Sequence, residues 1–239
     1  MKNKFLTICL AVVVTGTFLT SCKKNNNAPA TSLASSSQLS VGIKSANAID
    51  TVSGSAIITW TSGTANVSEF KFEASKQGLQ IEVTSHTLTN VDLFALNPSL
   101  IGITLDTGTY SEIELRAELQ PSSSSTLPLV LKGSFMPTGG ASIPVEFDFN
   151  DFAEIKARAQ NVVVNGSTNL TTMIVMHLNK LFANVTAAEL TAATLTSGTI
   201  VISSSSNSQI YNQIKDQLSS CGDDDGFHRH DRFGGGDDN

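Results

Sequence analysis

Residues 112–119, Glu-Ile-Glu-Leu-Arg-Ala-Glu-Leu, alternate strictly between charged and apolar side chains. Successive side chains of a β-strand point to opposite faces of a sheet, so this stretch predicts a strand with one buried and one solvated face. The same period of two recurs in residues 69–74 and 145–149. These alternating stretches favour a sheet that buries one side and exposes the other.

Shorter apolar runs predict further strands at 56–60, 79–84, 100–105, 127–135, 155–164, 170–178 and 198–203. Turn residues such as Gly63 and Gly78 separate the runs, and Asn165-Gly166 is typical of a tight hairpin. About ten strands without long helices between them predict an all-β fold, an antiparallel β-sandwich. We expect one short helix near 179–193, because Leu178, Leu181, Phe182 and Val185 fall at helical spacing and Thr186–Glu189 resembles a capping box. A C-terminal helix is expected at about 208–219.

The composition limits the classes of partner. The chain has 239 residues, 40% of them hydrophobic, and a formal charge of −6. This apolar content suffices for one sizeable β domain. Because a negative protein cannot neutralise many phosphates, nucleic acid is not expected as a partner.

The first 21 residues have the pattern of a signal peptide. Lys2 and Lys4 precede an apolar run that ends at Leu19 and is too short to span a bilayer comfortably. The sequence Leu19-Thr20-Ser21-Cys22 then resembles the lipobox of bacterial lipoproteins. This resemblance implies cleavage before Cys22, a thioether from its thiol to diacylglycerol and acylation, as with palmitate, of the new amine.

The expected acyl chains would tie the protein to a membrane. Lys23-Lys24 after Cys22 resembles signals that do not retain a lipoprotein at the inner membrane, so an outer-membrane location is expected, at the surface or the periplasmic face. Removal of residues 1–21 takes away two lysines and no acidic residue, which leaves a charge of −8. Cys9 leaves with the signal, so Cys221 would be the one free thiol of the mature chain.

Four segments are therefore expected: a signal peptide at 1–21, the lipidated cysteine and a flexible stalk at 22–54, the β-sandwich domain at 55–220, and a disordered acidic and histidine-containing tail at 221–239. The end of the stalk stays open. Leu39, Val41 and Ile43 alternate with small polar residues or lysine, which is compatible with either stalk or a short edge strand.

A second resemblance lies in residues 91–96, 103–105 and 107–115, which include the turn Thr107-Gly108-Thr109-Tyr110. They resemble a pattern in β-sandwich lipoproteins of Bacteroidetes-type bacteria, although Asp106-Thr107 stands where that pattern often has a proline. The resemblance implies a fold and a location, and no activity. Asp50-Thr51-Val52 resembles the O-glycosylation acceptor of such bacteria, which makes Thr51 a candidate; the alternative is an ordinary polar turn.

Standard catalytic motifs are absent from the sequence, so neither enzymatic activity nor a cofactor is expected. The carboxylates of Glu112, Glu114 and Glu118 share a strand face, where they suit acid–base work or calcium, or form a solvated face balanced by Arg116. The solvated face is the favoured interpretation. His86 and His177 lack partners at ligand spacing and are interpreted as strand or core-edge side chains.

The aromatic residues and the tail offer two further candidates. Trp60, with Tyr110 and Tyr211, is interpreted as core rather than as a sugar-binding platform. In the tail, Cys221 stands near the weak metal candidates His228, His230 and Asp231, but their spacing fits no defined metal site.

The sequence as a whole predicts a lipid-anchored, non-catalytic interaction, adhesion or assembly module of the cell envelope. Its partner would be an envelope protein or a glycan. The alternatives are an envelope sugar-binding protein or hydrolase that uses the acidic strand face, and a tail that captures metal weakly.

Overall fold

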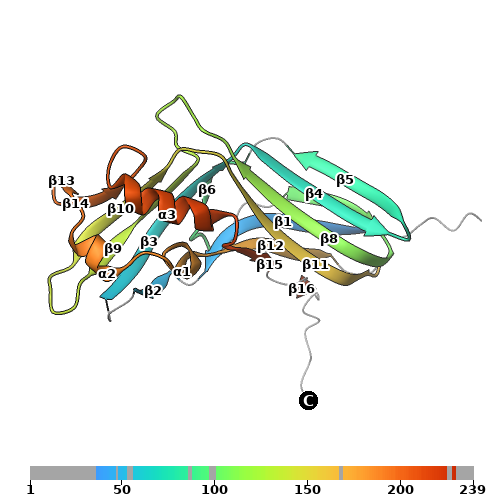
Figure 1. Ribbon diagram of the computed structural model, residues 1–239. Coiled ribbons are helices and arrows are strands. Elements are labelled where there is room, and N and C mark those ends of the chain that lie inside the picture. Colours follow the sequence, from blue (N-terminus) through green and yellow to red (C-terminus); the bar gives the residue numbers. More distant parts are fainter. Residues whose placement is uncertain are drawn as a thin grey trace, which may run out of the picture. The chain divides into compact units, whose positions relative to one another are not determined.

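The computed structural model describes residues 36–46, 48–52, 56–85, 88–96, 101–166, 169–224 and 228–229. Within these residues the chain forms three sheets and three short helices, which confirms the expected all-β, sandwich-like fold (Figure 1). Figure 1 shows the sheets as two groups of strands joined end to end, with a third layer beneath one of them.

The first sheet, called the charged sheet, has the order β11-β8-β4-β5 and is antiparallel throughout. Its strands are β11 (Ala153–Val164), β8 (Gly108–Leu119), β4 (Glu69–Lys76) and β5 (Leu79–Ser85). The sequence that predicted a half-buried strand is β8, which lies between β11 and β4. On the inner face of β8 the apolar side chains are at most 2% exposed, from Ile113 to Leu119.

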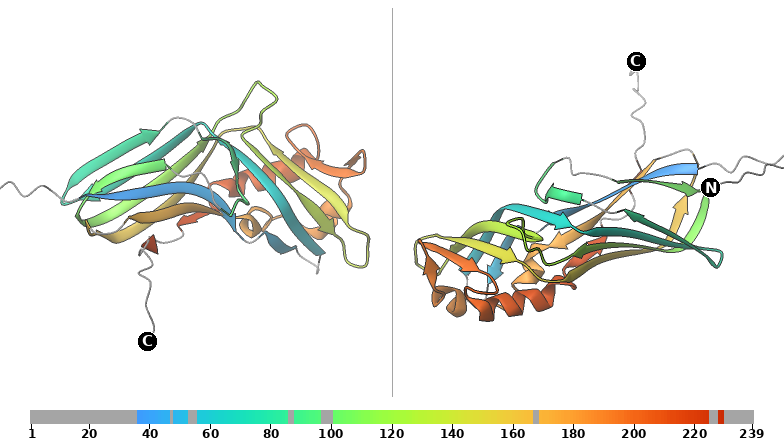
Figure 2. Two further views of the ribbon diagram at one scale, coloured as in Figure 1. Left: turned by 180° about the vertical axis from the view of Figure 1, so that it is seen from behind. Right: turned by 90° about the horizontal axis from the view of Figure 1, so that it is seen from above.

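The second sheet, called the N-terminal sheet, has the order β15-β12-β1-β7, and β16 also pairs with β12. Its strands are β15 (Gly222–Asp224), β12 (Leu170–His177), β1 (Ser36–Ala46), β7 (Ile101–Asp106) and β16 (His228–Arg229). The inner side chains of β1 join the same core cluster as those of β4 and β8, so this sheet closes the sandwich over the charged sheet. Figure 2 shows β1 crossing that sheet when seen from behind.

The third sheet, called the helix-covered sheet, has the order β13-β14-β10-β9-β3-β2, with β6 pairing β3. Its strands are β13 (Leu195–Thr196), β14 (Thr199–Ile202), β10 (Ile143–Phe149), β9 (Leu129–Met136), β3 (Ala56–Val67), β2 (Ile49–Val52) and β6 (Leu88–Asp92). The helices are α1 (Leu178–Leu181), α2 (Ala187–Thr191) and α3 (Ser208–Leu218). Figure 2 shows α3 lying along this sheet.

Aromatic contacts fix the helices to this sheet. Tyr211 of α3 packs on Phe147 and Phe149 of β10, with ring centroids 5.9 and 6.1 Å away. Phe182, which follows α1, packs on Trp60 of β3 at 5.2 Å. The apolar residues that recur every four positions in α3 are buried, which confirms the expected C-terminal helix.

The short helix expected near 179–193 is present as the two pieces α1 and α2. The predicted capping box is confirmed: the Glu189 backbone N–H donates to Thr186 Oγ1 at 3.2 Å, and the Thr186 backbone N–H donates to Glu189 Oε2 at 2.8 Å. Of the apolar residues at helical spacing, Leu178 and Leu181 lie in α1, whereas Phe182 and Val185 lie in the connection that separates α1 from α2.

The charged sheet and the helix-covered sheet are joined end to end by two short connections. Only Ser68 separates β3 from β4, and residues 150–152 alone separate β10 from β11. The Ser68 backbone N–H and hydroxyl both donate to the carbonyl of Glu118, at 2.9 and 3.0 Å, which fixes the bend between the charged and helix-covered sheets.

The boundary expected at residue 54 differs from the structure. Residues 36–46 form β1, an interior strand in which Leu39, Val41 and Ile43 are fully buried. β1 pairs antiparallel with β7 and parallel with β12, so it is neither stalk nor an edge strand. Serines are frequent in this strand, and even the buried face carries Ser37, at 4% exposure, which explains why composition alone suggested a stalk.

The expected start of the tail at residue 221 also differs. Cys221 is fully buried, and Gly222–Asp224 form β15 on the open edge of β12. A Cβ on Gly222 would come within 2.4 Å of the Lys156 carbonyl oxygen in β11, so β15 is pressed against the charged sheet. The last strands therefore close this side of the sandwich, because β15 pairs with one sheet and contacts the other.

Two turn predictions are wrong. Asn165-Gly166 does not join a hairpin, because β11 pairs with β8 while β12 pairs with β1, β15 and β16 in the other layer. Gly63 lies inside β3, where a Cβ would meet Leu131 at 2.8 Å and Phe94 at 3.0 Å. Glycine is used here for close packing rather than for a turn.

The turn from β7 to β8 crosses between the layers of the sandwich. Gly108 has φ +142°, which favours glycine, and the buried Tyr110 donates its hydroxyl to the Asp106 carbonyl at 2.9 Å. This bond resembles the tyrosine corner of sandwich folds, in which a tyrosine hydroxyl binds backbone a few residues upstream. Lys76 donates to the Thr107 carbonyl and lies over the Tyr110 ring, which holds the turn against β4.

Replacement of Gly222 tests whether the C-terminal strand closes the sandwich. We expect Gly222→Ala to lower the free energy of unfolding by about 1–3 kcal/mol, because backbone must move to accommodate the new methyl group. Gly102→Ala is the control, since a Cβ there meets only the end of the flexible Gln38 side chain. Equal denaturant midpoints for the two variants would contradict the close packing of β15.

Candidate functional site

The outer face of the charged sheet carries rows of charge that run across its strands. Register places Lys156, Arg116 and Lys71 side by side, and places Glu154, Glu118 and Glu69 in the adjacent row. Opposite charges lie two residues apart along each strand, so each cation has an acidic neighbour. Ion pairs join Lys71 to Glu69 at 3.3 Å and Lys156 to Glu154 at 2.5 Å.

Glu114 is the most buried charged group on this face, with 4% of its surface exposed. It accepts hydrogen bonds from Arg116 and Arg158, and Arg116 also reaches Glu73 at 3.2 Å. Burial on its own would raise the pKa of Glu114, but the two arginines outweigh it and lower that pKa. A carboxylate held ionised by two guanidinium groups is a poor proton donor.

The acidic residues selected from the sequence do share this face, and Arg116 does lie between them. Next to Glu112 and Glu114 the surface has a shallow hollow of about 300 Å³, also lined by Glu73, Ser75, Gln80 and Ser111. Because Glu114 and Glu73 are paired with arginine, the geometry supports the interpretation of an ion-paired surface over that of an acid–base or calcium site.

The polar-edged aromatic residues do not form a sugar platform. Trp60, Tyr110 and Tyr211 are each at most 2% exposed, so their rings belong to the core. The Trp60 ring packs on Phe182 and its indole N–H is buried without a hydrogen-bond partner, so the residue serves packing and presents no polar group to a ligand.

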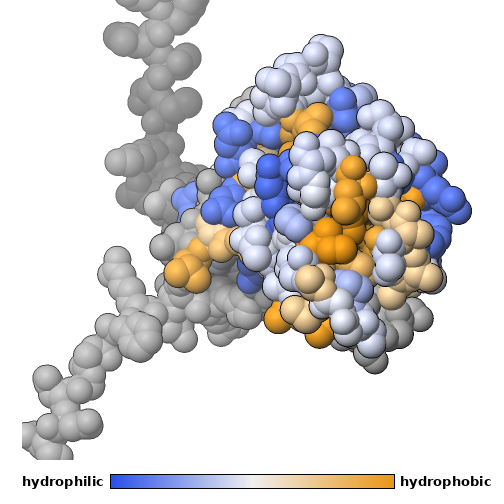
Figure 3. Space-filling view, turned by 90° about the vertical axis from the view of Figure 1, so that its left-hand side faces the viewer, coloured by the Kyte–Doolittle hydropathy of each residue, from blue (hydrophilic) through white to orange (hydrophobic). Residues whose placement is uncertain are grey.

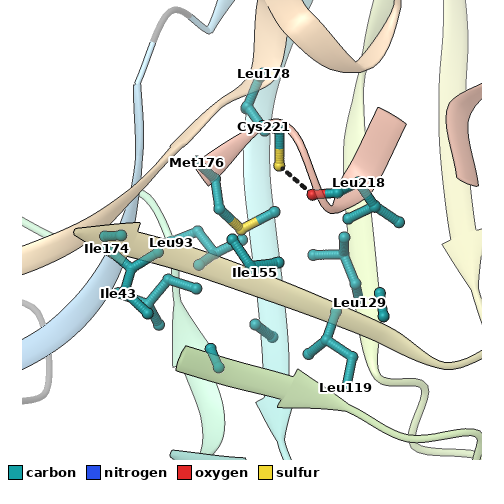
Figure 4. Packing of buried hydrophobic residues seen from close by; sticks show 14 of the residues in the cluster. Ile43, Leu93, Leu119, Leu129, Ile155, Ile174, Met176, Leu178, Leu218 and Cys221 are labelled. Carbon is teal, nitrogen blue, oxygen red and sulfur yellow. Dashed lines mark hydrogen bonds between the residues drawn. The ribbon is translucent and has the colours of Figure 1, made fainter. Parts of the chain in front are cut away.

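Cys221 lies in the core at the end of α3, among apolar side chains that include Met176 and Ile155 (Figure 4). Its thiol donates to the Leu218 carbonyl at 3.0 Å. Burial raises the pKa of this thiol to about 12. A buried, protonated thiol is a weak nucleophile, so the structure favours a packing role over pairing with another chain.

The described residues contain no group of three or more His, Cys, Asp or Glu side chains placed to hold a metal ion. His177 lies at the end of β12, where its backbone N–H donates to the Cys221 carbonyl at 2.9 Å. His228 lies in β16, opposite Thr171. His86, His230 and Asp231 lie outside the described residues.

The sequence predicted two modification sites, Thr51 and Cys22. Thr51 lies in β2, at an edge of the helix-covered sheet and opposite Ile57. Cys22 lies outside the described residues, so its acylation stays a prediction. In the part of the chain that the structure describes, every helix is too short or too polar to cross a bilayer.

A groove that the sequence did not reveal lies between the C-terminal half of α3 and the start of β11. It has a volume of about 550 Å³ and is lined by Phe152, Ala153, Glu154, Lys156, Lys215, Asp216 and Ser219. Phe152 is 52% exposed, although most large apolar side chains of β10 and β11 are buried. An exposed aromatic ring beside a groove is the arrangement that a sugar-binding platform needs and that the buried Trp60 does not provide.

Asp151 positions this part of the groove. Its carboxylate accepts a hydrogen bond from Lys215 of α3 and another, at 2.8 Å, from the Phe152 backbone N–H. These two bonds lower the pKa of Asp151, the lysine having the larger effect. The junction between β10 and β11 is thus tied to α3, which fixes the backbone that carries Phe152.

Phe152 breaks the alternation on both sides of it. The inward residues are odd-numbered in β10, as in Phe147 and Phe149, and odd-numbered again at the start of β11, as in Ala153 and Ile155. A phenylalanine at an even position is therefore out of phase with both strands. This is the signal in the sequence that could have identified an exposed ring.

Figure 3 faces the end of the fold at which β13, β14 and the turn after β9 lie. A hydrophobic area lies to the right of the centre of this face, and hydrophilic residues lie on both sides of it. Leu195 in β13 and Met136 in β9 are each about half exposed. Single exposed apolar side chains are usual on protein surfaces, so we assign no partner to them.

Comparison with known proteins gives no family assignment: the chain matches no protein-family model, no curated protein and no solved structure.

Acid titration tests the role of Glu114. Because the arginines lower its pKa in the folded state, its contribution to stability is present above the ordinary carboxyl pKa and is lost as pH falls through the folded value. We expect Glu114→Gln to lower the free energy of unfolding at neutral pH by about 1–3 kcal/mol and to reduce the loss of stability on acidification. Glu112→Gln is the control on the same strand and face. An acid profile unchanged by Glu114→Gln would disprove the assignment.

Thiol labelling tests the burial of Cys221. At about pH 8 we expect iodoacetamide to leave Cys221 of the native protein unmodified and to alkylate it once guanidinium unfolds the chain, because the buried thiol stays protonated at this pH. Peptide mass spectrometry distinguishes this cysteine from the others. Rapid labelling of the native protein would show that the thiol is accessible.

Proposed function

We propose that this chain is a lipid-anchored, non-catalytic binding module of a bacterial cell envelope. The observation that carries the proposal is the lipobox-like sequence Leu19-Thr20-Ser21-Cys22, followed after Cys22 by only 13 residues before the first strand of a folded β body begins at Ser36. A body built this way would be held close to the lipid.

The chemistry of lipid attachment supports an anchor at Cys22. Cysteine is the residue whose sulfur is nucleophilic enough to be alkylated by a lipid donor. A single acyl chain gives only marginal membrane binding, whereas two or three give a stable anchor. The lysines at 23 and 24 favour transfer to the outer membrane, at its surface or its periplasmic face.

The surface chemistry supports binding over catalysis. The carboxylates that an envelope hydrolase would use on the charged sheet are engaged with arginine, as Glu114 and Glu73 are with Arg116. By contrast, the groove between α3 and β11 combines an exposed ring with polar side chains, which suits recognition of a ligand. An envelope protein or a glycan is therefore the expected partner, and a sugar-binding role is the second candidate, favoured by Phe152.

Cell fractionation tests the anchor. In a bacterium that processes lipoproteins, we expect the native chain in the membrane fraction and Cys22→Ala outside it, because the variant has no sulfur to alkylate. Cys221→Ala is the matched control, since it also removes a cysteine and should stay in the membrane.

Mass spectrometry of the purified protein should show a mature chain that begins at an acylated Cys22. An unmodified N-terminus at another residue, or equal membrane recovery of Cys22→Ala, would overturn the anchoring step. Protease treatment of intact cells then separates the two expected locations, because a surface protein is cleaved and a periplasmic one is protected.

A further inference from the structure

The groove between α3 and β11 has the size of a ligand site. Its volume of about 550 Å³ falls within the range of about 300–1,000 Å³ found for small-molecule pockets. One wall is β11 at the edge of the charged sheet, and the other is the last two turns of α3, which are anchored by the buried Ile214 and Leu218. Both walls are fixed by the core, so the groove exists without a ligand.

The polar groups of the groove are balanced in charge. Glu154 and Asp216 contribute two carboxylates, and Lys156 and Lys215 contribute two ammonium groups. Lys156 is already paired with Glu154 at 2.5 Å, and Lys215 with Asp151. A groove with no excess of either sign selects neither an anion nor a cation, but it offers donors and acceptors to a neutral, hydroxyl-rich ligand.

Phe152 supplies an apolar contact within this polar setting. Its ring is 52% exposed, and its backbone is fixed by the Asp151 carboxylate. The face of an aromatic ring carries partial negative charge and attracts the slightly positive C–H groups of a flat molecule stacked on it. Pyranose rings present such a C–H face and carry hydroxyl groups around their rim.

From these three observations we infer that the groove between α3 and β11 binds a neutral oligosaccharide, with one pyranose ring stacked on Phe152 and its hydroxyl groups hydrogen-bonded to Glu154, Lys156 and Asp216. This inference deepens the binding role proposed above by naming the class of ligand. It does not depend on acylation of Cys22, because the groove is formed entirely by described residues of the β body.

Calorimetric titration of the full-length purified protein tests the inference. The probes are maltohexaose, cellohexaose and xylohexaose, in a detergent without a sugar headgroup. We expect at least one of them to bind, and its affinity to stay nearly constant between about 50 and about 500 mM NaCl, because a neutral ligand is not subject to charge screening.

Substitutions then locate the site. We expect Phe152→Ala to weaken binding about tenfold or more and Phe152→Tyr to retain it within about threefold, since tyrosine keeps the aromatic face. Val163→Ala is the matched control: Val163 lies near the far end of β11, is 53% exposed, and is not part of the groove. Each variant should keep the unfolding midpoint of the parent protein, because both side chains are exposed.

Three outcomes would overturn the inference: none of the three hexaoses binds, Phe152→Ala binds as well as the parent, or a hexagalacturonate binds tighter than every neutral probe with strong salt dependence. The last result would mark a site for anions. Failure of the anchor is detected separately by fractionation, so the two proposals can fail independently.

Discussion

The burial of one face of β8 is the constraint on which the rest of the fold depends. This strand pairs along its length with β11 on one side and β4 on the other, and its apolar face from Ile113 to Leu119 is closed off from water. Because side chains alternate, the register that buries this face also fixes the charged rows on the opposite one. A shift of one residue would bring Glu114 and Arg116 into the core, at a cost no single strand could offset.

That constraint explains which features of the fold could be predicted. Strands with one solvent-exposed face, such as β4, β8 and β10, could be predicted from the alternation of polar and apolar residues, and the predicted positions agree with the structure. The capping box at Thr186 could also be predicted, because both of its hydrogen bonds lie within a segment of four residues. What these features share is that the sequence signal and its cause are neighbours in the chain.

The features that were missed depend on partners far away in the sequence. β1 has the composition of a linker, and it is a strand because β7 and β12 pair with it, more than fifty and more than a hundred residues later. Gly63 looks like a turn, yet it is required by the close approach of Leu131 on β9. Asn165-Gly166 has good hairpin chemistry, but the flanking strands already have partners in different layers. In each case a non-local contact overrides a correct local preference.

The same distinction separates the two candidate surfaces. The charged face could be recognised from β8 alone, but its chemistry could not, because the ionisation of Glu114 depends on Arg158 from β11 as well as on its neighbour Arg116. The groove needs α3 and β11 together, and only the out-of-phase Phe152 hints at it in the sequence. The acidic residues of the charged sheet are therefore poor candidates for ligand binding, because arginine and lysine side chains neutralise them. The groove beside Phe152 is the better candidate. The bend between β10 and β11 is tied to α3 through Asp151 and Lys215, and this position keeps the Phe152 ring outside the core and half exposed.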